Sequence, residues 1–224
     1  MSVSIIIPTF NEAGCIAETI DSLRRQKPRE IIVVDGGSTD DTLAVAHDAD
    51  RVLTSQPGRA FQMNAGAQGA SGDSLLFLHA DCRLEAGALP ALERTLARPH
   101  IAAGCFSMRV EAAGWPFRSI DACASARVRL TGIVYGDQGL FLKRDLFTRL
   151  GGFPRLNFME DVFFSHTLAH QGRIVVVNRN ILVSPRRWQK VGLVRQTLTN
   201  WTLTALALYG VSPDRLTAHY PPVR

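Results

Sequence analysis

Acidic side chains end two apolar stretches of the sequence and form an adjacent pair further along. Asp35 and Asp81 each close a run typical of a buried strand, and Glu160 and Asp161 stand side by side. Because ligands bind at the carboxyl ends of parallel strands, we expect these acids to share one edge of a sheet. Unpaired carboxylates gathered in one crevice indicate a cation, a sugar hydroxyl or a proton to be transferred. For any one of them alone, a helix cap or a turn is the simpler interpretation.

A second group of polar residues lies in the stretch 57–67. Arg59 and Gln62 are three residues apart, so they share a face if this stretch is helical. A guanidinium can bind phosphate oxygens through two parallel hydrogen bonds. Arg59 is therefore a candidate contact for a diphosphate or a nucleotide, and an exposed helical arginine is the alternative.

The elements that must position these residues alternate between short apolar runs and helical patterns, which is typical of βαβ units. Asn11 can cap a helix that follows the first run. The predicted strands are residues 4–10, 31–37, 51–54, 74–81, 102–110, 139–142 and 173–177, and the predicted helices include 59–68, 117–130 and 161–170. The sequence thus predicts an α/β fold with a mixed, mainly parallel central sheet flanked by helices.

Composition is that of one globular domain. The chain has 224 residues, 46% of them hydrophobic and 20% charged, and no linker or repeat divides it, so we expect a single domain over residues 1–224. The cysteines form no CxxC pair, and we expect buried free thiols at Cys15, Cys82, Cys105 and Cys123. The start, residues 1–10, lacks the basic segment of a secretory signal and is too short in apolar residues to span a membrane. We therefore expect a cytoplasmic protein, with peripheral contact at the inner face of the membrane left open.

The excess of basic residues indicates which classes of partner the protein can bind. The formal net charge is +5 and the sequence pI about 9.4, which suits nucleic acid, an anionic membrane or an acidic small substrate. The charge is concentrated in residues 24–29 and 186–195, and either cluster can simply be solvated surface. We expect an acidic small substrate and no nucleic acid.

Four motifs stand together in a familiar order. SIIIPTFNE, IIVVDGGSTDDT, FLHAD and MEDV resemble the motifs of family 2 glycosyltransferases of the GT-A type, over roughly residues 2–177. Within that family the sequence is similar to the short, soluble, single-domain members. The resemblance implies a Rossmann-like GT-A fold and the transfer of a single sugar from a nucleotide diphosphate sugar, with a UDP sugar favoured, to an unknown acceptor hydroxyl.

The resemblance also implies residue roles on the donor side, in residues 1–110. The base and ribose would be held by Pro8, Thr9, Asn11, Glu12 and Asp35, with Gly36 and Gly37 shaping the loop. His79-Ala80-Asp81 takes the place of the DxD motif, so Asp81 would bind Mg²⁺ or Mn²⁺. His79 replaces the first acid and would contact ribose or phosphate, or be merely structural.

The acceptor side is expected in residues 111–192. Asp161 would act as the general base of an inverting displacement, with Glu160 in support. Asp137 and Gln138 are acceptor-site candidates or a simple turn. Arg187 and Trp188 match part of the QxxRW motif of processive synthases, but Ser184 stands in place of its glutamine, which favours transfer of single sugars.

The spacing of apolar residues predicts an amphipathic helix over residues 193–210. Its predicted apolar face is formed by Val194, Leu198, Trp201, Ala205 and Leu208, and Gly210 is a plausible stop. The helix could lie on an anionic membrane and deliver a lipid-linked acceptor, or it could pack on its own domain or on a second subunit as a homodimer. We expect the packed helix.

Two other functions compete with sugar transfer. One is a catalytically inactive regulator that binds nucleotide sugars or a membrane surface. His79, in place of the first acid of the DxD motif, favours this alternative, whereas the presence of Asp161 argues against it. The other is a nucleotidyltransferase, which usually needs a glycine-rich loop with a lysine near the N-terminus, and residues 8–14 offer neither.

Overall fold

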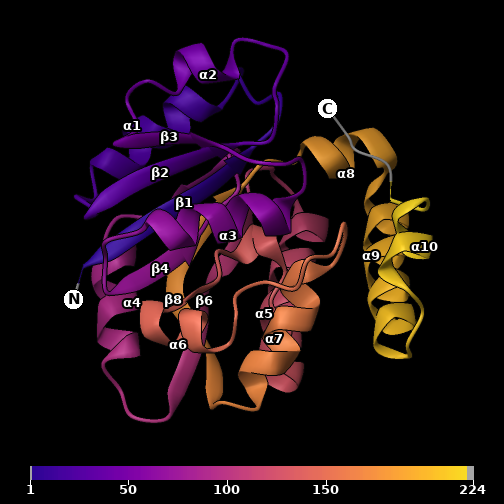
Figure 1. The fold of residues 1–224 in the computed structure, drawn as a ribbon. Coiled ribbons are helices and arrows are strands. Elements are labelled where there is room, and N and C mark those ends of the chain that lie inside the picture. Colours follow the sequence, from indigo (N-terminus) through magenta and orange to yellow (C-terminus); the bar gives the residue numbers. More distant parts are fainter. Residues whose placement is uncertain (1, 221–224) are drawn as a thin grey trace.

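The computed structural model describes residues 2–220, whose strands form one sheet between two layers of helices (Figure 1). Within this range the sheet has eight strands in the order β3-β2-β1-β4-β7-β6-β8-β5. The strands are β1 (Val3–Thr9), β2 (Glu30–Asp35), β3 (Arg51–Thr54), β4 (Ser74–Phe77), β5 (Cys82–Leu84), β6 (Ile101–Val110), β7 (Phe141–Lys143) and β8 (Arg173–Val183). The helices are α1 (Ile16–Arg24), α2 (Thr42–Val45), α3 (Arg59–Gly69), α4 (Ala88–Leu96), α5 (Trp115–Thr131), α6 (Arg144–Arg149), α7 (Glu160–Ala169), α8 (Arg186–Val191), α9 (Leu193–Leu208) and α10 (Pro213–Thr217), with a 3-10 turn η1 at Gly136–Gln138.

The sheet is mixed, as the sequence predicts. β1 pairs parallel with β2 and β4, β2 with β3, and β6 with β8. β7 is antiparallel to both β4 and β6, and β5 is antiparallel to β8. The parallel strands β1, β2 and β3 carry their carboxyl ends to the same edge, where the candidate residues of the first half are delivered.

Both faces of the sheet are covered at its centre, which explains why β1, β2 and β4 are largely apolar. Ile5 and Ile7 of β1 pack on one side with α1 and α4, whereas Ile6 packs on the other with α3, α6 and α7. A strand buried on both faces has no solvent side to carry polar residues. A third and smaller apolar cluster joins the start of α7 to α9 and α10.

Several strand boundaries differ from the prediction, the short strand β5 was not predicted, and two of the differences bear on the site. The run that was expected to reach Asp81 leaves the sheet after Phe77, so Asp81 lies in the turn before β5 rather than at the end of a strand. The strand predicted for residues 173–177 continues to Val183, because β6 and then β5 remain available as partners.

The loop after β1 is built differently from the prediction. Asn11 does not cap α1, which begins five residues later without a side-chain cap. Instead the Asn11 Oδ1 accepts a hydrogen bond from the backbone N–H of Thr39 at 2.8 Å, and its backbone N–H donates to Ser38 Oγ at 2.8 Å. Asn11 therefore ties the loop after β1 to the loop after β2.

The C-terminal helix forms as predicted, but its predicted apolar face is wrong in orientation. Val194, Leu198, Trp201 and Leu208 are between 45% and 67% exposed, and Ala205 is exposed as well. The buried side of α9 is formed by Gln196, Leu203, Thr204 and Ala207. Polar contacts around the neighbouring cavity hold this side inward, so α9 packs on its own domain with the opposite face. Gly210 follows the helix with a φ of 92°, consistent with a C-terminal stop.

All four cysteines are free. Cys82 and Cys105 are buried and Cys15 is partly buried, as expected, whereas Cys123 on α5 is exposed.

The Gln62 side chain joins the carboxyl ends of the parallel strands β1 and β2, and a substitution there tests this role. Its side chain is buried, and Nε2 donates to the carbonyls of Thr9 at 2.7 Å and Val34 at 2.8 Å. The substitution Gln62→Leu keeps the volume but leaves two carbonyls without this donor, so we expect a loss of about 2–4 kcal/mol in the free energy of unfolding. Urea unfolding measures it. The control is Gln68→Leu on the exposed side of the same helix, and equal losses in the two variants would refute the bracing role.

Candidate functional site

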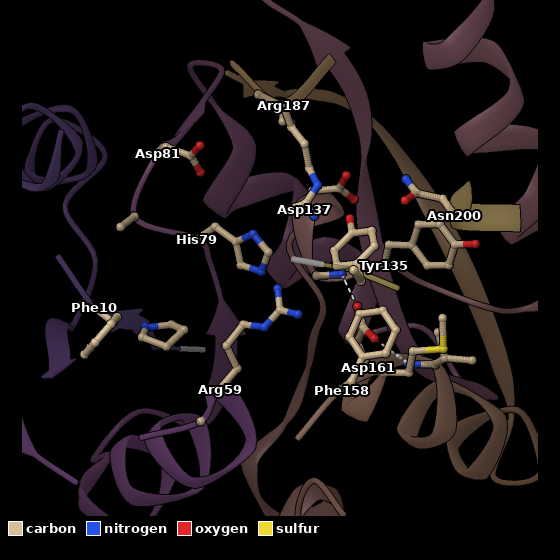
Figure 2. Close-up of a pocket in the computed structure, with 18 of the residues that line it drawn as sticks. Phe10, Arg59, His79, Asp81, Tyr135, Asp137, Phe158, Asp161, Arg187 and Asn200 are labelled. Carbon is tan, nitrogen blue, oxygen red and sulfur yellow. Dashed lines mark hydrogen bonds between the residues drawn. The ribbon is translucent and has the colours of Figure 1, made fainter. Parts of the chain in front are cut away.

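One cavity of about 540 Å³ opens between the carboxyl edge of the sheet and the C-terminal helices. Figure 2 shows its residues arriving from both halves of the chain, with Asp81, His79 and Arg59 on one side and Asp137, Tyr135 and Asp161 on the other. The predicted site residues that line it are Pro8, Thr9, Glu12, Arg59, His79, Asp81, Asp137, Asp161, Arg187 and Trp188. The cavity therefore brings most of the expected donor-side and acceptor-side residues together.

The remaining predicted residues are not among those that line the cavity. They are Asn11, Asp35, Gly36, Gly37, Gln138 and Glu160. The Asp35 carboxylate is buried and accepts hydrogen bonds from the backbone N–H groups of Gly37 and Ser38, both at 2.8 Å. Gln138 is buried and accepts a hydrogen bond from Arg127. In this structure these side chains shape the loops that carry the lining residues, and their contacts with a ligand stay predictions.

Asp161 is held at the start of α7 with its carboxylate toward the cavity. Its Oδ2 accepts a hydrogen bond from the backbone N–H of Gly136 at 2.6 Å, and its Oδ1 accepts one from the N–H of Val162 at 2.8 Å. Met159, just before the helix, has a φ of 61°, so the chain turns sharply into α7 there. Two backbone donors therefore fix the orientation of a carboxylate that can accept a proton from a bound hydroxyl.

Glu160 points the other way and positions Arg59. The Glu160 side chain is 3% exposed, and its Oε1 lies 3.1 Å from the Nε of Arg59. The charge of Glu160 raises the pKa of Arg59 above its usual value, so the guanidinium stays protonated. Arg59 is 40% exposed on the cavity side, where a charged guanidinium can bind an anion.

His79 is neutral and sits against the backbone of η1. Burial, and then the charge of Arg59, lower its pKa to about 4. A Cβ atom added at Gly136 would lie 2.6 Å from the His79 Nε2, so only glycine allows this approach. Gly136 is therefore a site residue that sequence reasoning missed, although the polar turn around it was noticed.

Arg186 is the second residue that sequence reasoning missed. Its Nη2 donates to the Oδ2 of Asp81 at 2.9 Å and lies 3.4 Å from the Oε2 of Glu12. The pair with Asp81 spans 105 positions of the sequence, so only the folded chain reveals it. The basic cluster read as solvated surface thus supplies a cation to the part of the cavity where the donor is expected.

The fit of a divalent cation rests on Asp81. Among residues 2–220 no group of three or more His, Cys, Asp or Glu side chains is placed to hold a metal ion. Asp81 has a carboxylate that is 28% exposed in the cavity and faces a cationic group. One such carboxylate can hold Mg²⁺ or Mn²⁺ when phosphate and water oxygens complete the shell. The site therefore fits a cation that arrives with a diphosphate. Arg186 would compete with that cation for the Asp81 carboxylate.

The C-terminal segment closes the side of the cavity where the acceptor is expected. The Cζ of Arg187 lies 3.7 Å from the centre of the Tyr220 ring, and the Nε of Arg187 donates to the Oε1 of Gln196 at 3.2 Å. The Tyr135 hydroxyl is 2.6 Å from the Oγ1 of Thr204. Trp188 is buried with its ring in the larger core cluster. Sequence reasoning missed the contribution of α9 and Tyr220, because its predicted apolar face directed attention to the other side of the helix.

Asp137 gives a prediction of pH dependence. Burial raises the pKa of its carboxyl to about 6, and its Oδ1 has no hydrogen-bond partner among the described residues. The folded state therefore binds this proton more tightly than the unfolded state, so this group destabilises the fold as the pH rises from about 4 to above 6. The substitution Asp137→Asn removes this dependence. We expect its melting temperature, relative to the unmodified protein, to rise between pH 4 and pH 7.

Melting curves of both proteins across this range measure the difference. A difference that stays constant with pH, or that falls, would contradict the burial of an ionised Asp137.

Solved structures of sugar-transferring proteins have a similar fold. The mannosyltransferase PcManGT from Pyrobaculum calidifontis, in complex with GDP-Man and Mn²⁺, matches with a TM-score of 0.69 and 25% identity over 95% of this chain and 66% of its own. The fragment 1-349 of TarS from S. aureus, in complex with UDP-GlcNAc, matches with a TM-score of 0.65 and 21% identity, covering 82% of this chain and 58% of the fragment. The fold of this chain is therefore that of GT-A glycosyltransferases.

Sequence comparison agrees. The PGL/p-HBAD biosynthesis glycosyltransferase of Mycobacterium bovis is 41% identical over 88 residues, and the match covers 35% of this chain and 34% of that protein. The chain thus matches about a third of the length of such curated relatives. The sequence model described as glycosyl transferase family 2 matches residues 4–149, which is more than half of the chain. The convergence of Asp81, Asp161 and Arg59 on one cavity of this fold accords with that match, and the chain belongs to glycosyl transferase family 2.

Proposed function

We propose that this protein transfers a single sugar from a nucleotide diphosphate sugar to the hydroxyl of an acceptor, with inversion at the anomeric carbon. The observation that carries the proposal is that the Asp161 carboxylate and the cationic side chains Arg59 and Arg186 line the same cavity. A reaction of this kind needs a base at the acceptor and positive charge at the departing diphosphate.

The donor side offers the groups that a nucleotide diphosphate requires. Arg59 and Arg186 are guanidinium groups at the cavity wall, and both can bind phosphate oxygens. The backbone of Pro8 and Thr9 lines the cavity at the end of β1, beside the loop that Asn11 and Asp35 hold in shape. The structural neighbours carry GDP-Man in one case and UDP-GlcNAc in another, and we propose a UDP sugar for this chain.

The transfer itself is a single displacement. Asp161 takes the proton of the acceptor hydroxyl while its oxygen forms a bond to the anomeric carbon, and the bond from that carbon to the diphosphate oxygen breaks. The electron pair leaves with the diphosphate, whose charge Arg59 and Arg186 stabilise. One displacement without a covalent intermediate inverts the anomeric configuration.

A divalent cation would assist on the donor side. Asp81 would hold it, and it would neutralise charge on the diphosphate. The neighbour that carries GDP-Man also carries Mn²⁺, which supports this assignment. His79, kept neutral by burial, would donate or accept a hydrogen bond at the ribose or phosphate rather than hold a metal ion.

The remaining features of the proposal concern setting. Free thiols at all four cysteines suit a reducing compartment, so we place the reaction in the cytoplasm. The departure of Ser184 from the processive motif supports the release of the product after one transfer. No helix within residues 2–220 has the length and apolarity needed to cross a membrane.

The first test separates catalysis from donor binding. Asp161→Asn keeps the shape of the side chain but removes the proton acceptor, so we expect sugar release from the donor to fall by about 10²–10⁴-fold. Nucleotide affinity should stay within about threefold, since Asp161 lies on the acceptor side. Hydrolysis of UDP sugars, in which water replaces the acceptor, and calorimetric titration with UDP measure the two effects.

Asp48→Asn, on an exposed residue away from the cavity, is the control. Donor binding by the unmodified protein without any hydrolysis or transfer would point instead to a regulator that binds nucleotide sugars, which the pairing of Arg186 with Asp81 also favours. Binding of GDP in preference to UDP would overturn the choice of base alone.

The second test concerns Arg186. Removing its charge with Arg186→Gln frees the Asp81 carboxylate, so we expect Mn²⁺ to bind the nucleotide-free protein about tenfold more tightly, which corresponds to the loss of one charge-assisted hydrogen bond. UDP binding in the presence of EDTA should weaken at the same time. Arg195→Gln, which removes the same charge from an exposed position on α9, should change neither affinity. Unaltered Mn²⁺ affinity in Arg186→Gln would show that Asp81 is not the cation ligand.

A further inference from the structure

The outer face of α9 is apolar along its whole length. Val194, Leu198, Trp201 and Leu208 are 67%, 54%, 48% and 45% exposed, and Tyr209 at the end of the helix is 90% exposed. At 1.5 Å per residue this stripe is about 22 Å long. Contiguous apolar surface of this size marks a contact site on a folded protein.

The helix cannot turn this face inward without opening the cavity. On its inner side the Nε2 of Gln196 donates to Asn200 Oδ1 at 2.6 Å and to the Tyr220 hydroxyl at 3.3 Å, and Thr204 contacts Tyr135. Leu203 packs with the start of α7 in the small apolar cluster. These contacts fix the rotation of α9, so the outer stripe is a lasting feature of the surface and not an unfilled part of the core.

The charges on α9 and on the helices that flank it in the sequence are predominantly positive. Arg195 lies on α9 itself and is exposed, and Lys190 and Arg215 are exposed on the helices before and after it. α9 contains no acidic residue. The one acid in residues 184–220, Asp214, accepts a hydrogen bond from Asn157. A second copy of this chain would bring the same positive charges to the interface, whereas an anionic lipid surface would compensate them.

The types of residue in the stripe also fit a lipid surface. Trp201 and Tyr209 have an apolar ring with one polar group, and such side chains gather at the boundary between lipid and water. Figure 1 shows α9 and α10 together at one edge of the molecule, away from the central sheet. The side chains of the stripe are exposed there and can meet a planar surface. A helix that lies in the interface needs only one apolar face.

We infer that the outer face of α9 docks this protein on an anionic lipid bilayer. The helix lies in the plane of the interface, with Leu198 and Trp201 inserted among the acyl chains and Arg195 against the headgroups. Because Gln196, Asn200 and Thr204 on the opposite face line the cavity, docking brings the acceptor side close to the membrane. An acceptor carried by a lipid could reach Asp161 from there, a consequence that rests on the proposed sugar transfer.

Vesicle sedimentation tests the docking without any donor or acceptor. The probe is phosphatidylcholine vesicles in which about a third of the lipid is phosphatidylglycerol, compared with pure phosphatidylcholine at low and high salt. We expect binding to the anionic vesicles that weakens with salt, and at least a tenfold loss of binding in the double variant Leu198→Ser with Trp201→Ser. The matched control is Leu43→Ser with Val52→Ser, which removes two exposed apolar side chains on α2 and β3.

Several outcomes would show that α9 does not dock on an anionic bilayer. Equal binding by the two double variants, or no binding of the unmodified protein to anionic vesicles, would overturn the inference. So would a dimer in light scattering that the α9 variant alone dissociates, because the stripe would then be a subunit interface. UDP binding by the same α9 variant, with an unchanged melting temperature, shows that the fold and the donor site survive independently of docking.

Discussion

The cavity depends on compensating a concentration of negative charge at one edge of the sheet. Asp81, Asp137 and Asp161 all line it, and Glu160 lies just behind. Carboxylates that lose water without gaining a cation or a donor are costly, and the fold meets this need in different ways. Arg59 pairs with Glu160, Arg186 pairs with Asp81, and backbone N–H groups hold Asp161. The Asp137 Oδ1 has no hydrogen-bond partner among residues 2–220, and burial raises the pKa of this carboxyl.

This constraint separates what sequence reasoning could find from what it could not. The strands were predictable, because burial on both faces leaves uninterrupted apolar runs such as residues 31–34. The acids were predictable too, since they follow those runs in the order of the family motifs. Their partners were not, because Arg186 meets Asp81 across 105 positions and Gly136 contacts His79 from a distant part of the sequence. No local pattern encodes such a contact, and a basic cluster in sequence looks the same whether or not it faces an acid.

The C-terminal helix shows the same limit from another direction. Helical periodicity correctly separated an apolar face of α9 from a polar one. It could not tell which face turns inward, and the usual rule that apolar faces are buried gave the wrong orientation. Here the polar side chains of Gln196, Asn200 and Thr204 face inward, where they border the cavity. The same periodic pattern in an amphipathic helix beside a polar cavity is therefore compatible with either face being buried.

Arg186 and a metal ion would neutralise the same carboxylate, but they are not equivalent devices. A metal ion arrives from solution and leaves the rest of the chain unaffected, whereas Arg186 is the first residue of α8, which leads directly into α9. The pair with Asp81 therefore restrains α8 against the turn before β5, and under the proposed function a diphosphate or a cation that binds Asp81 would change this restraint. Since α9 follows α8 after a single glycine and lines the same cavity, the proposed donor site would be mechanically connected to the wall proposed for the acceptor. The ion pair that balances charge in the cavity thereby links the two parts of its wall.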